Sequence, residues 1–191
     1  RVRPCNGMEL NVAKECECLR ISGECMITAY NPGKQPKQYT YDKVLGQEAM
    51  QNDVFDVAGV PMVDNCMAGY NSSIFVYGQT GAGKTHTMMG ELDSVAGECN
   101  DERGLAPRMI EQLFEKISEA EDAAGRDHLR YSCRCSCLEI YNETITDLLN
   151  PSLTNLAIRE DQNKGVYVEG LSEKEVLNVD DVMNLMIKGH K

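Results

Sequence analysis

The residues best suited to chemistry form one glycine-rich segment, Gly78–Thr85, which reads GQTGAGKT and fits the pattern GxxxxGK[ST]. Glycines allow successive backbone N–H groups to point at phosphate oxygens, and a side chain at Gly81 or Gly83 would block that approach. Lys84 offers a positive charge to the β and γ phosphates, and the Thr85 hydroxyl offers a ligand to Mg²⁺. The segment therefore predicts a binding site for the triphosphate of a nucleotide.

Hydrolysis of a bound triphosphate needs two further groups, an acid on Mg²⁺ and a group that positions the attacking water. Two acids that follow apolar runs, Glu139 and Asp180, are candidates for the metal. Glu139 is better explained as a polar strand residue, and Asp180 as an acid in the first turn of a helix. The residues alone therefore predict nucleotide binding and leave the hydrolytic half of the site open.

The segments on either side of the loop have the order that such a site needs. The apolar run Ile74–Tyr77 predicts a strand directly before the loop, covered on both faces as in a parallel sheet. His86–Met89 can continue as a helix after the loop. Before the strand, apolar spacing from 52 to 70 predicts a helix that is kinked at Pro61.

The remaining periodicities alternate between strand and helix, which favours one α/β unit. Strands are expected at 19–21, 26–30, 39–41 and 131–141, with two more around a turn at 161–165; helices are expected from Pro107 through Ile117 and after the capping residue Asn178. The acidic stretch 91–102 predicts an exposed loop.

Composition narrows the class of protein further. The 191 residues carry a formal net charge of −11, which disfavours nucleic acid and anionic membranes as partners. No apolar run is long enough to cross a bilayer. The nine cysteines include Cys133, Cys135 and Cys137, whose spacing differs from the CxxC pairs of zinc sites and places all three on one side of a strand. We expect structural thiols in a reducing compartment.

Segments along nearly the whole chain match motifs of the kinesin motor domain in order, and the chain resembles that family. The matching segments are Arg1–Pro4, Tyr39–Val44, Gly69–Met88, Gly104–Arg108, Leu138–Glu143 and Asp147–Leu149. The segments Cys133–Cys137 and Gly165–Gly170 are most similar to plant members of the mitotic kinesin-12 group. The resemblance implies an α/β fold of the P-loop NTPase type, in which helices flank a central, mostly parallel sheet.

The resemblance also implies a site for ATP and Mg²⁺. Its nucleotide-binding residues would be Gly78, Gln79, Thr80, Gly81, Ala82, Gly83, Lys84, Thr85, His86, Arg1, Arg3 and Pro4. Lys84 and Thr85 would be catalytic, and Thr85 would hold the metal. The two arginines and the proline would border the adenine, with the histidine nearby.

Microtubules are the partner that the resemblance implies. Arg159 and Lys164 would face β-tubulin, whose acidic surface attracts bases. Gln162 and Thr144 stand where relatives often carry lysine, and a solvated turn is the alternative at this place. The parent protein would lie in the cytoplasm on microtubules and oligomerise through a coiled coil outside this chain.

The chain departs from the family pattern at its ends. It stops before the NxxSSRSH and DxxG switches and the main microtubule-binding helix, so residues 1–191 are expected to be a partial motor domain truncated at both ends. Three functions stay open: a microtubule-stimulated ATPase, a truncated nucleotide- or tubulin-binding fragment without turnover, and an unrelated P-loop ATPase or kinase that uses Glu139 on its metal.

Overall fold

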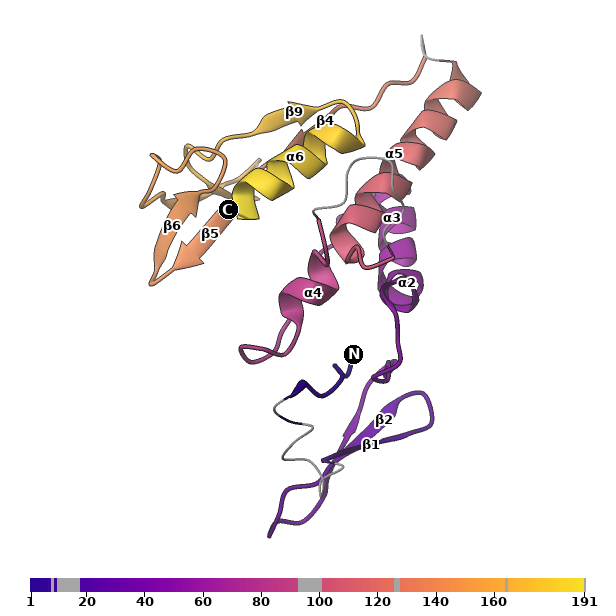
Figure 1. Cartoon of the computed structure of the whole chain (residues 1–191). Helices are drawn as coiled ribbons and strands as arrows, with labels where there is room; N and C mark the ends of the chain where they lie inside the picture. Colours follow the sequence, from indigo (N-terminus) through magenta and orange to yellow (C-terminus); the bar gives the residue numbers. More distant parts are fainter. Residues whose placement is uncertain (8, 10–17, 93–100, 126–127, 164, 191) are drawn as a thin grey trace. The chain divides into compact units, whose positions relative to one another are not determined.

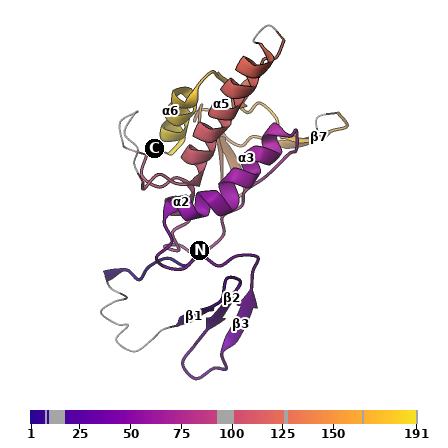
Figure 2. The same ribbon diagram turned by 90° about the vertical axis from the view of Figure 1, so that its right-hand side faces the viewer.

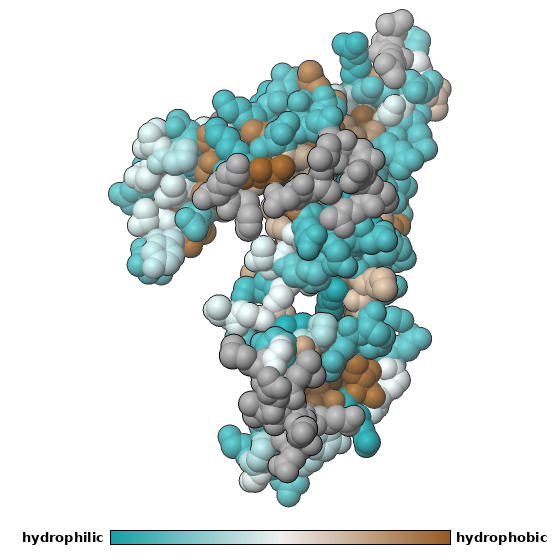
Figure 3. Space-filling model, in the orientation of Figure 1, coloured by the Kyte–Doolittle hydropathy of each residue, from teal (hydrophilic) through white to brown (hydrophobic). Residues whose placement is uncertain are grey.

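The structure is a computed structural model that describes residues 1–7, 9, 18–92, 101–125, 128–163 and 165–190 (Figures 1 and 2). The chain divides into two compact units: Arg1–Glu91 with Cys99–Arg108, and Leu92–Glu98 with Met109–Lys191. Among the described residues, no helix combines the length and apolar character that crossing a membrane requires. Hydrophilic residues predominate on the face drawn in Figure 3.

The first unit contains a three-stranded antiparallel sheet in the order β1-β2-β3, visible in Figure 2: β1 (Leu19–Ser22), β2 (Met26–Ala29) and β3 (Lys37–Thr40). Ile27 of the central strand lies opposite Ile21 on one side and Tyr39 on the other, and it is buried. Gly23 turns the chain between the first two strands with φ +67°, which glycine adopts without steric cost. The strands expected in this part of the sequence are confirmed.

The helix predicted around Pro61 is present as three consecutive pieces: α2 (Gln51–Val54), the π-helical turn η1 (Phe55–Gly59) and α3 (Val60–Met67). Pro61 lies in the first turn of α3 and has no N–H to donate. The Val60 N–H bonds to the Phe55 carbonyl, five residues back, which widens the turn ahead of the proline. The predicted interruption at Pro61 is therefore confirmed.

The predicted strand before the glycine-rich loop is wrong in one respect, because residues 71–79 pair with no other strand in the described part of the chain. Ile74 and Val76 are half-buried, whereas Phe75 and Tyr77 are 87% and 89% exposed and stack on each other with ring centroids 6.3 Å apart. Alternate side chains thus face opposite sides, as in an extended strand, but only one side is covered.

Two helices follow the loop: α4 (Lys84–Met88) and α5 (Leu105–Ala124). Between them the chain closes on itself, because Glu91 N–H donates to Glu102 O at 3.1 Å and Gly104 N–H donates to Met89 O at 2.9 Å. The amphipathic helix predicted from Pro107 is confirmed and is longer than expected. Most of the predicted acidic loop, residues 93–100, lies outside the described residues.

Three two-stranded antiparallel sheets belong to the second unit: β4 (Cys133–Cys135) with β9 (Lys174–Val176), β5 (Leu138–Tyr141) with β6 (Thr144–Asp147), and β7 (Ile158–Asp161) with β8 (Gly165–Val168). The last pair confirms the hairpin predicted around 161–165. The single strand predicted at 131–141 is wrong, because the chain changes partner between Cys135 and Leu138. The alternation also breaks there, because Cys137 and Leu138 are both half-buried and residues 139–141 are all exposed.

The three cysteines of this region are half-buried and form no disulfide. Burial raises the pKa of the Cys135 and Cys137 thiols, which favours the protonated form. No group of three metal-ligating side chains occurs in the described residues.

The second unit ends in α6 (Val179–His190), which begins where the sequence predicts. Asn178 Oδ1 accepts from Asp181 N–H at 2.9 Å, and Asp181 Oδ2 accepts from Leu177 N–H at 2.9 Å. These bonds satisfy backbone donors that a helix start leaves open.

The expected parallel sheet is not represented by any strand pair of the described residues, since every such pair is antiparallel. Antiparallel neighbours can be joined by short turns, as most of these are, whereas parallel pairing needs partners far apart in the chain.

Candidate phosphate-binding site

The loop Gly78–Thr85 folds back tightly on itself in the first unit. Ala82 N–H donates to Gln79 O at 3.0 Å, and Gly81 and Gly83 adopt φ +79° and +90°. A side chain disfavours these left-handed conformations. No protein atom would lie within 4 Å of a Cβ on Gly81, so within the chain the requirement for glycine there is conformational.

The Lys84 side chain crosses the start of this loop. Its Nζ donates to Gly78 O at 2.7 Å and to Gln79 O at 3.0 Å. Gly78 also approaches the other arm of the loop, because a Cβ placed on it would lie 2.9 Å from the Cβ of Ala82. The ammonium group is thus held over the glycine-rich turn, where it can meet an anion.

Thr85 lies in the first turn of α4 and is exposed. Its carbonyl accepts from both Met89 N–H at 2.8 Å and Gly90 N–H at 3.1 Å. The hydroxyl suits Mg²⁺, which prefers oxygen ligands and usually takes only one or two from a protein, the rest coming from phosphates and water. The loop, its lysine and this threonine therefore fit a magnesium–triphosphate complex.

Arg1 is brought against the same region from the start of the chain. Its Nη1 donates to Gln51 Oε1 at 2.7 Å and to Thr87 Oγ1 of α4 at 3.4 Å, and its Nη2 donates to Ala49 O at 2.9 Å. His86 of α4 contacts the same glutamine, with its ring Nε2 3.3 Å from Gln51 Nε2. The structure thus brings together the two predicted residues Arg1 and His86 through a third that was not predicted.

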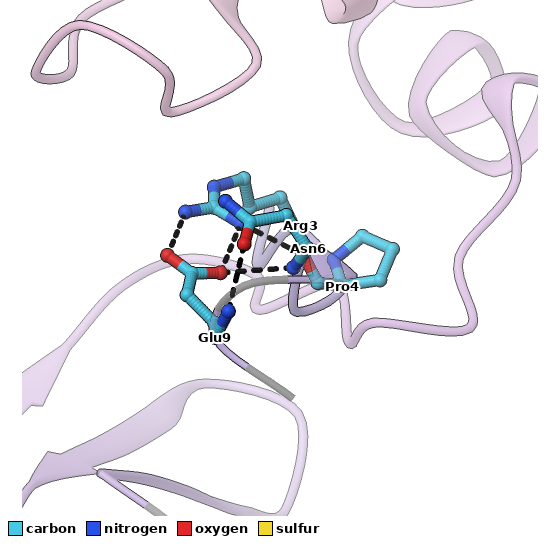
Figure 4. A network of polar contacts seen from close by, with 4 residues as sticks. All are labelled: Arg3, Pro4, Asn6 and Glu9. Atoms are coloured by element: carbon cyan, nitrogen blue, oxygen red, sulfur yellow. Dashed lines mark hydrogen bonds and ion pairs between the residues drawn. The ribbon is translucent and has the colours of Figure 1, made fainter. Parts of the chain in front are cut away.

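Arg3 and Pro4 form part of a second polar network, shown in Figure 4. Arg3 donates to both carboxylate oxygens of Glu9, at 2.8 and 2.5 Å, and to Pro4 O at 2.9 Å. Glu9 Oε2 also accepts from Asn6 N–H at 2.9 Å, and Asn6 Oδ1 accepts from Glu9 N–H at 2.9 Å. The Arg3 Cβ lies 4.0 Å from the position that a Cβ would take on Gly83.

The charges of the Arg3–Glu9 pair stabilise each other. The hydrogen bond from Arg3 and that from the Asn6 backbone lower the pKa of Glu9 to about 2. The bond to Glu9 in turn raises the pKa of Arg3. Both groups are therefore charged at neutral pH, and the guanidinium plane is fixed by a two-pronged contact.

The remaining predicted site residues belong to the second unit. Arg159 on β7 forms an ion pair with Glu169, with Nε and Oε2 3.0 Å apart. Lys164 lies outside the described residues. Glu139 is an exposed residue of β5 and lies opposite Thr146. This position fits the interpretation of Glu139 as a polar strand residue. Asp180 is exposed in the first turn of α6, as its helix-start reading predicts.

Sequence reasoning missed two residues of the site region, Gln51 and Glu9. The spacing of Asn6 and Glu9 is that of a capping box, in which residue i and residue i+3 bond reciprocally. The sequence therefore contained a local pattern from which the position of Glu9 could have been predicted. No local pattern points to Gln51, because its hydrogen-bond partners are 35 to 51 residues away in sequence.

The chain is similar to known proteins over its whole length. The family model for the kinesin motor domain matches residues 1–191. The rice kinesin-like protein KIN-12F is 48% identical over 189 residues, covering 99% of this chain and 7% of the relative. KIN-12D of Arabidopsis thaliana is 46% identical over 190 residues, with coverage of 99% and 7%.

A solved structure, described as "Structure of a fast kinesin: Implications for ATPase mechanism and interactions with microtubules", superposes with a TM-score of 0.83 at 37% identity. It covers 100% of this chain, which spans 51% of that one. The P-loop NTPase fold and the similarity to plant kinesin-12 proteins are thereby confirmed. The chain belongs to the kinesin motor domain family.

Proposed function

We propose that this chain is the ATP-binding part of a motor that couples ATP hydrolysis to movement along microtubules in the cytoplasm. Family membership over residues 1–191 supports the proposal. The single observation that carries it is the position of Lys84. Its ammonium group donates hydrogen bonds to two carbonyl oxygens at the start of the glycine-rich loop. An ammonium held there by exchangeable contacts is ready to meet phosphate oxygens.

Lys84 and Thr85 are the residues that act on the phosphates in this proposal. Lys84 would move its hydrogen bonds from the loop carbonyls to the β and γ phosphates and stabilise the charge that develops during transfer. The Thr85 hydroxyl would hold Mg²⁺, which when bound neutralises charge on the phosphate oxygens. The backbone of Gly78–Gly83 would surround the phosphate groups.

The adenine would lie against Arg1, Arg3 and Pro4, with His86 nearby. Flat guanidinium groups stack well on aromatic rings. The contacts of Arg1 with α4 and of Arg3 beside Gly83 place both arginines next to the loop, which supports this assignment. The bidentate bond to Glu9 keeps the Arg3 plane in one orientation.

The contact with tubulin would use Arg159 and Lys164, since the tubulin surface is acidic. The Arg159 side chain is 57% exposed and its head group is paired with Glu169, so part of its charge is compensated within the chain. Oligomerisation would depend on a coiled coil outside these residues.

The test is Lys84→Ala in the full-length protein, with Lys34→Ala as the control at an exposed lysine outside the loop. Loss of charged hydrogen bonds should weaken binding of a fluorescent ATP analogue by about tenfold or more, without lowering the melting temperature. Unchanged affinity would rule out the phosphate-loop assignment. ATPase activity that microtubules fail to stimulate would instead mean that the protein binds and hydrolyses ATP without acting as a microtubule motor.

A further inference from the structure

Among the described residues of the first unit, the most deeply buried polar side chain is Gln51, only 2% exposed at the start of α2. A buried amide is costly unless its oxygen and nitrogen both find partners. Here both do. Gln51 Oε1 accepts from Arg1 Nη1 at 2.7 Å, and Gln51 Nε2 donates to His86 O at 2.7 Å and to Glu102 O at 3.3 Å.

The orientation of this amide is fixed by its partners. A guanidinium can only donate, so it requires the amide oxygen, and carbonyl oxygens can only accept, so they require the amide nitrogen. Turning the amide by 180° would place its NH₂ group against the Arg1 guanidinium and its oxygen against the carbonyl oxygens of His86 and Glu102. The Gln51 side chain therefore joins Arg1, α4 and the turn at Glu102 in one defined arrangement.

The hydrogen bond from Gln51 to the His86 carbonyl replaces a donor that α4 itself does not provide. In a regular helix the His86 carbonyl would accept from the N–H of Gly90, four residues on. That N–H instead donates to Thr85 O at 3.1 Å, five residues back, so the last turn of the helix is widened and the His86 carbonyl has no donor from α4. Gln51 Nε2 takes the place of the missing donor at 2.7 Å.

We propose that Gln51 is a positioning residue for the nucleotide site: it anchors the first turn of α4, which carries Lys84 and Thr85, and holds Arg1 beside that turn. This inference rests on the proposed function. Without the amide, the His86 carbonyl and the Arg1 guanidinium lose their shared partner, and α4 is free to shift against the start of the chain. Phosphate binding depends on sub-ångström placement of such groups.

Two substitutions at Gln51 separate positioning from packing in the full-length protein. Gln51→Leu keeps the approximate volume and removes both ends of the amide. Gln51→Glu keeps the shape and the acceptor for Arg1, but it places an oxygen against the carbonyls of His86 and Glu102. Gln38→Leu, on an exposed position of β3, makes the same chemical change away from the site and serves as the control.

The measurements are the dissociation constant of N-methylanthraniloyl-ATP, the KM for ATP and kcat, and the melting temperature. Positioning predicts that both Gln51 variants raise the dissociation constant and KM by about tenfold at temperatures well below melting, while Gln38→Leu leaves them unchanged. A role in packing alone predicts wild-type affinity for Gln51→Glu. That result, or lower melting temperatures with unaltered affinity, would overturn the inference.

Lys84→Ala in the same assay keeps the two proposals apart. If Lys84→Ala abolishes binding while the Gln51 variants bind as the wild type does, the positioning role fails and the proposed function stands. If Lys84→Ala binds the analogue normally, the phosphate-loop function itself fails. Should Gln51→Leu not fold, Gln51→Glu decides the question, because its retained acceptor can form an ion pair with Arg1.

Discussion

Glu9 binds the Arg3 guanidinium with both carboxylate oxygens, at oxygen–nitrogen distances of 2.5 and 2.8 Å, and the Arg3 Cβ lies 4.0 Å from the position that a Cβ would take on Gly83 in the glycine-rich loop. A two-pronged contact fixes the plane of the guanidinium as well as its position. Asn6 holds the carboxylate in turn through its backbone N–H. Glu9 therefore fixes the orientation of one of the predicted base-binding residues.

The first prediction concerns this clamp. Glu9→Gln should weaken binding of the ATP analogue by about two- to fivefold, because the neutral amide cannot hold both arms of the Arg3 guanidinium. Glu24→Gln removes a comparable exposed ion pair, with Lys43, and should leave affinity unchanged. Because the pKa of Glu9 is about 2, the wild-type clamp should persist from pH 8 down to about pH 4. Equal affinities for the two variants would contradict a role for the clamp.

The second prediction concerns the fully buried Asp147, whose carboxylate accepts from the N–H groups of Leu149, Asn150 and Ser172 at 2.8, 3.1 and 2.8 Å. Burial raises its pKa, but the hydrogen bonds from the Ser172 side chain and from these backbone groups outweigh burial, so the pKa is lowered overall. A folded-state pKa below the unfolded one stabilises the fold above the unfolded value of about 3.9 and loses that contribution as the pH falls through the folded value.

Asp147→Asn should accordingly lower the free energy of unfolding at pH 7 by about 1–3 kcal/mol, because an NH₂ group would face a buried N–H donor. The acid-induced loss of stability below about pH 4 should become shallower in this variant. Denaturant unfolding at several pH values measures both effects. Asp42→Asn, at an exposed position, is the control and should change neither quantity.

The third prediction concerns backbone conformation in the loop. Gly83→Ala should cost about 1–2 kcal/mol of stability, because φ is +90° there, and it should also weaken nucleotide binding. Gly33→Ala provides a matched control, since Gly33 has φ +75° and open space around its Cα but lies outside the loop. Calorimetry should give similar stability losses for both variants, and only Gly83→Ala should alter affinity for the ATP analogue. A loss of affinity in both would show a global effect.

The fourth prediction concerns the cap of α6. Asn178→Ala removes the acceptor for Asp181 N–H and should lower stability by about 1 kcal/mol. Asn184→Ala, at an exposed position within the same helix, should be neutral or slightly stabilising because alanine favours helix. Thermal unfolding of the two variants measures the difference. Similar melting temperatures would mean that the cap contributes nothing.

The fifth prediction concerns the proposed tubulin contact. Arg159→Ala should weaken microtubule co-sedimentation and reduce its dependence on salt, whereas Glu169→Gln should strengthen binding by freeing the Arg159 charge. Arg134→Ala breaks the analogous exposed pair with Glu173 and is the control. Binding that responds equally to Arg134→Ala and Arg159→Ala would remove Arg159 from the contact.

The sequence alone determined the features whose causes lie within a few residues. Gly78–Thr85 predicted the loop, Asn178 predicted the start of α6, and Pro61 predicted the break between α2 and α3. Caps, turns and proline act on neighbouring backbone groups, so their effects can be read from spacing.

Only the tertiary structure decided the partners of distant residues. The contact of Arg1 with Thr87 spans 86 positions, and the bonds of Gln51 join three segments that no local pattern connects. Likewise, the apolar pattern of residues 131–141 could not show that β4 pairs with β9 while β5 pairs with β6. Periodicity indicates which side of a strand is buried. The identity of the partner strand depends on how distant segments pack together and on the entropy of the loops between them, neither of which is a property of local sequence.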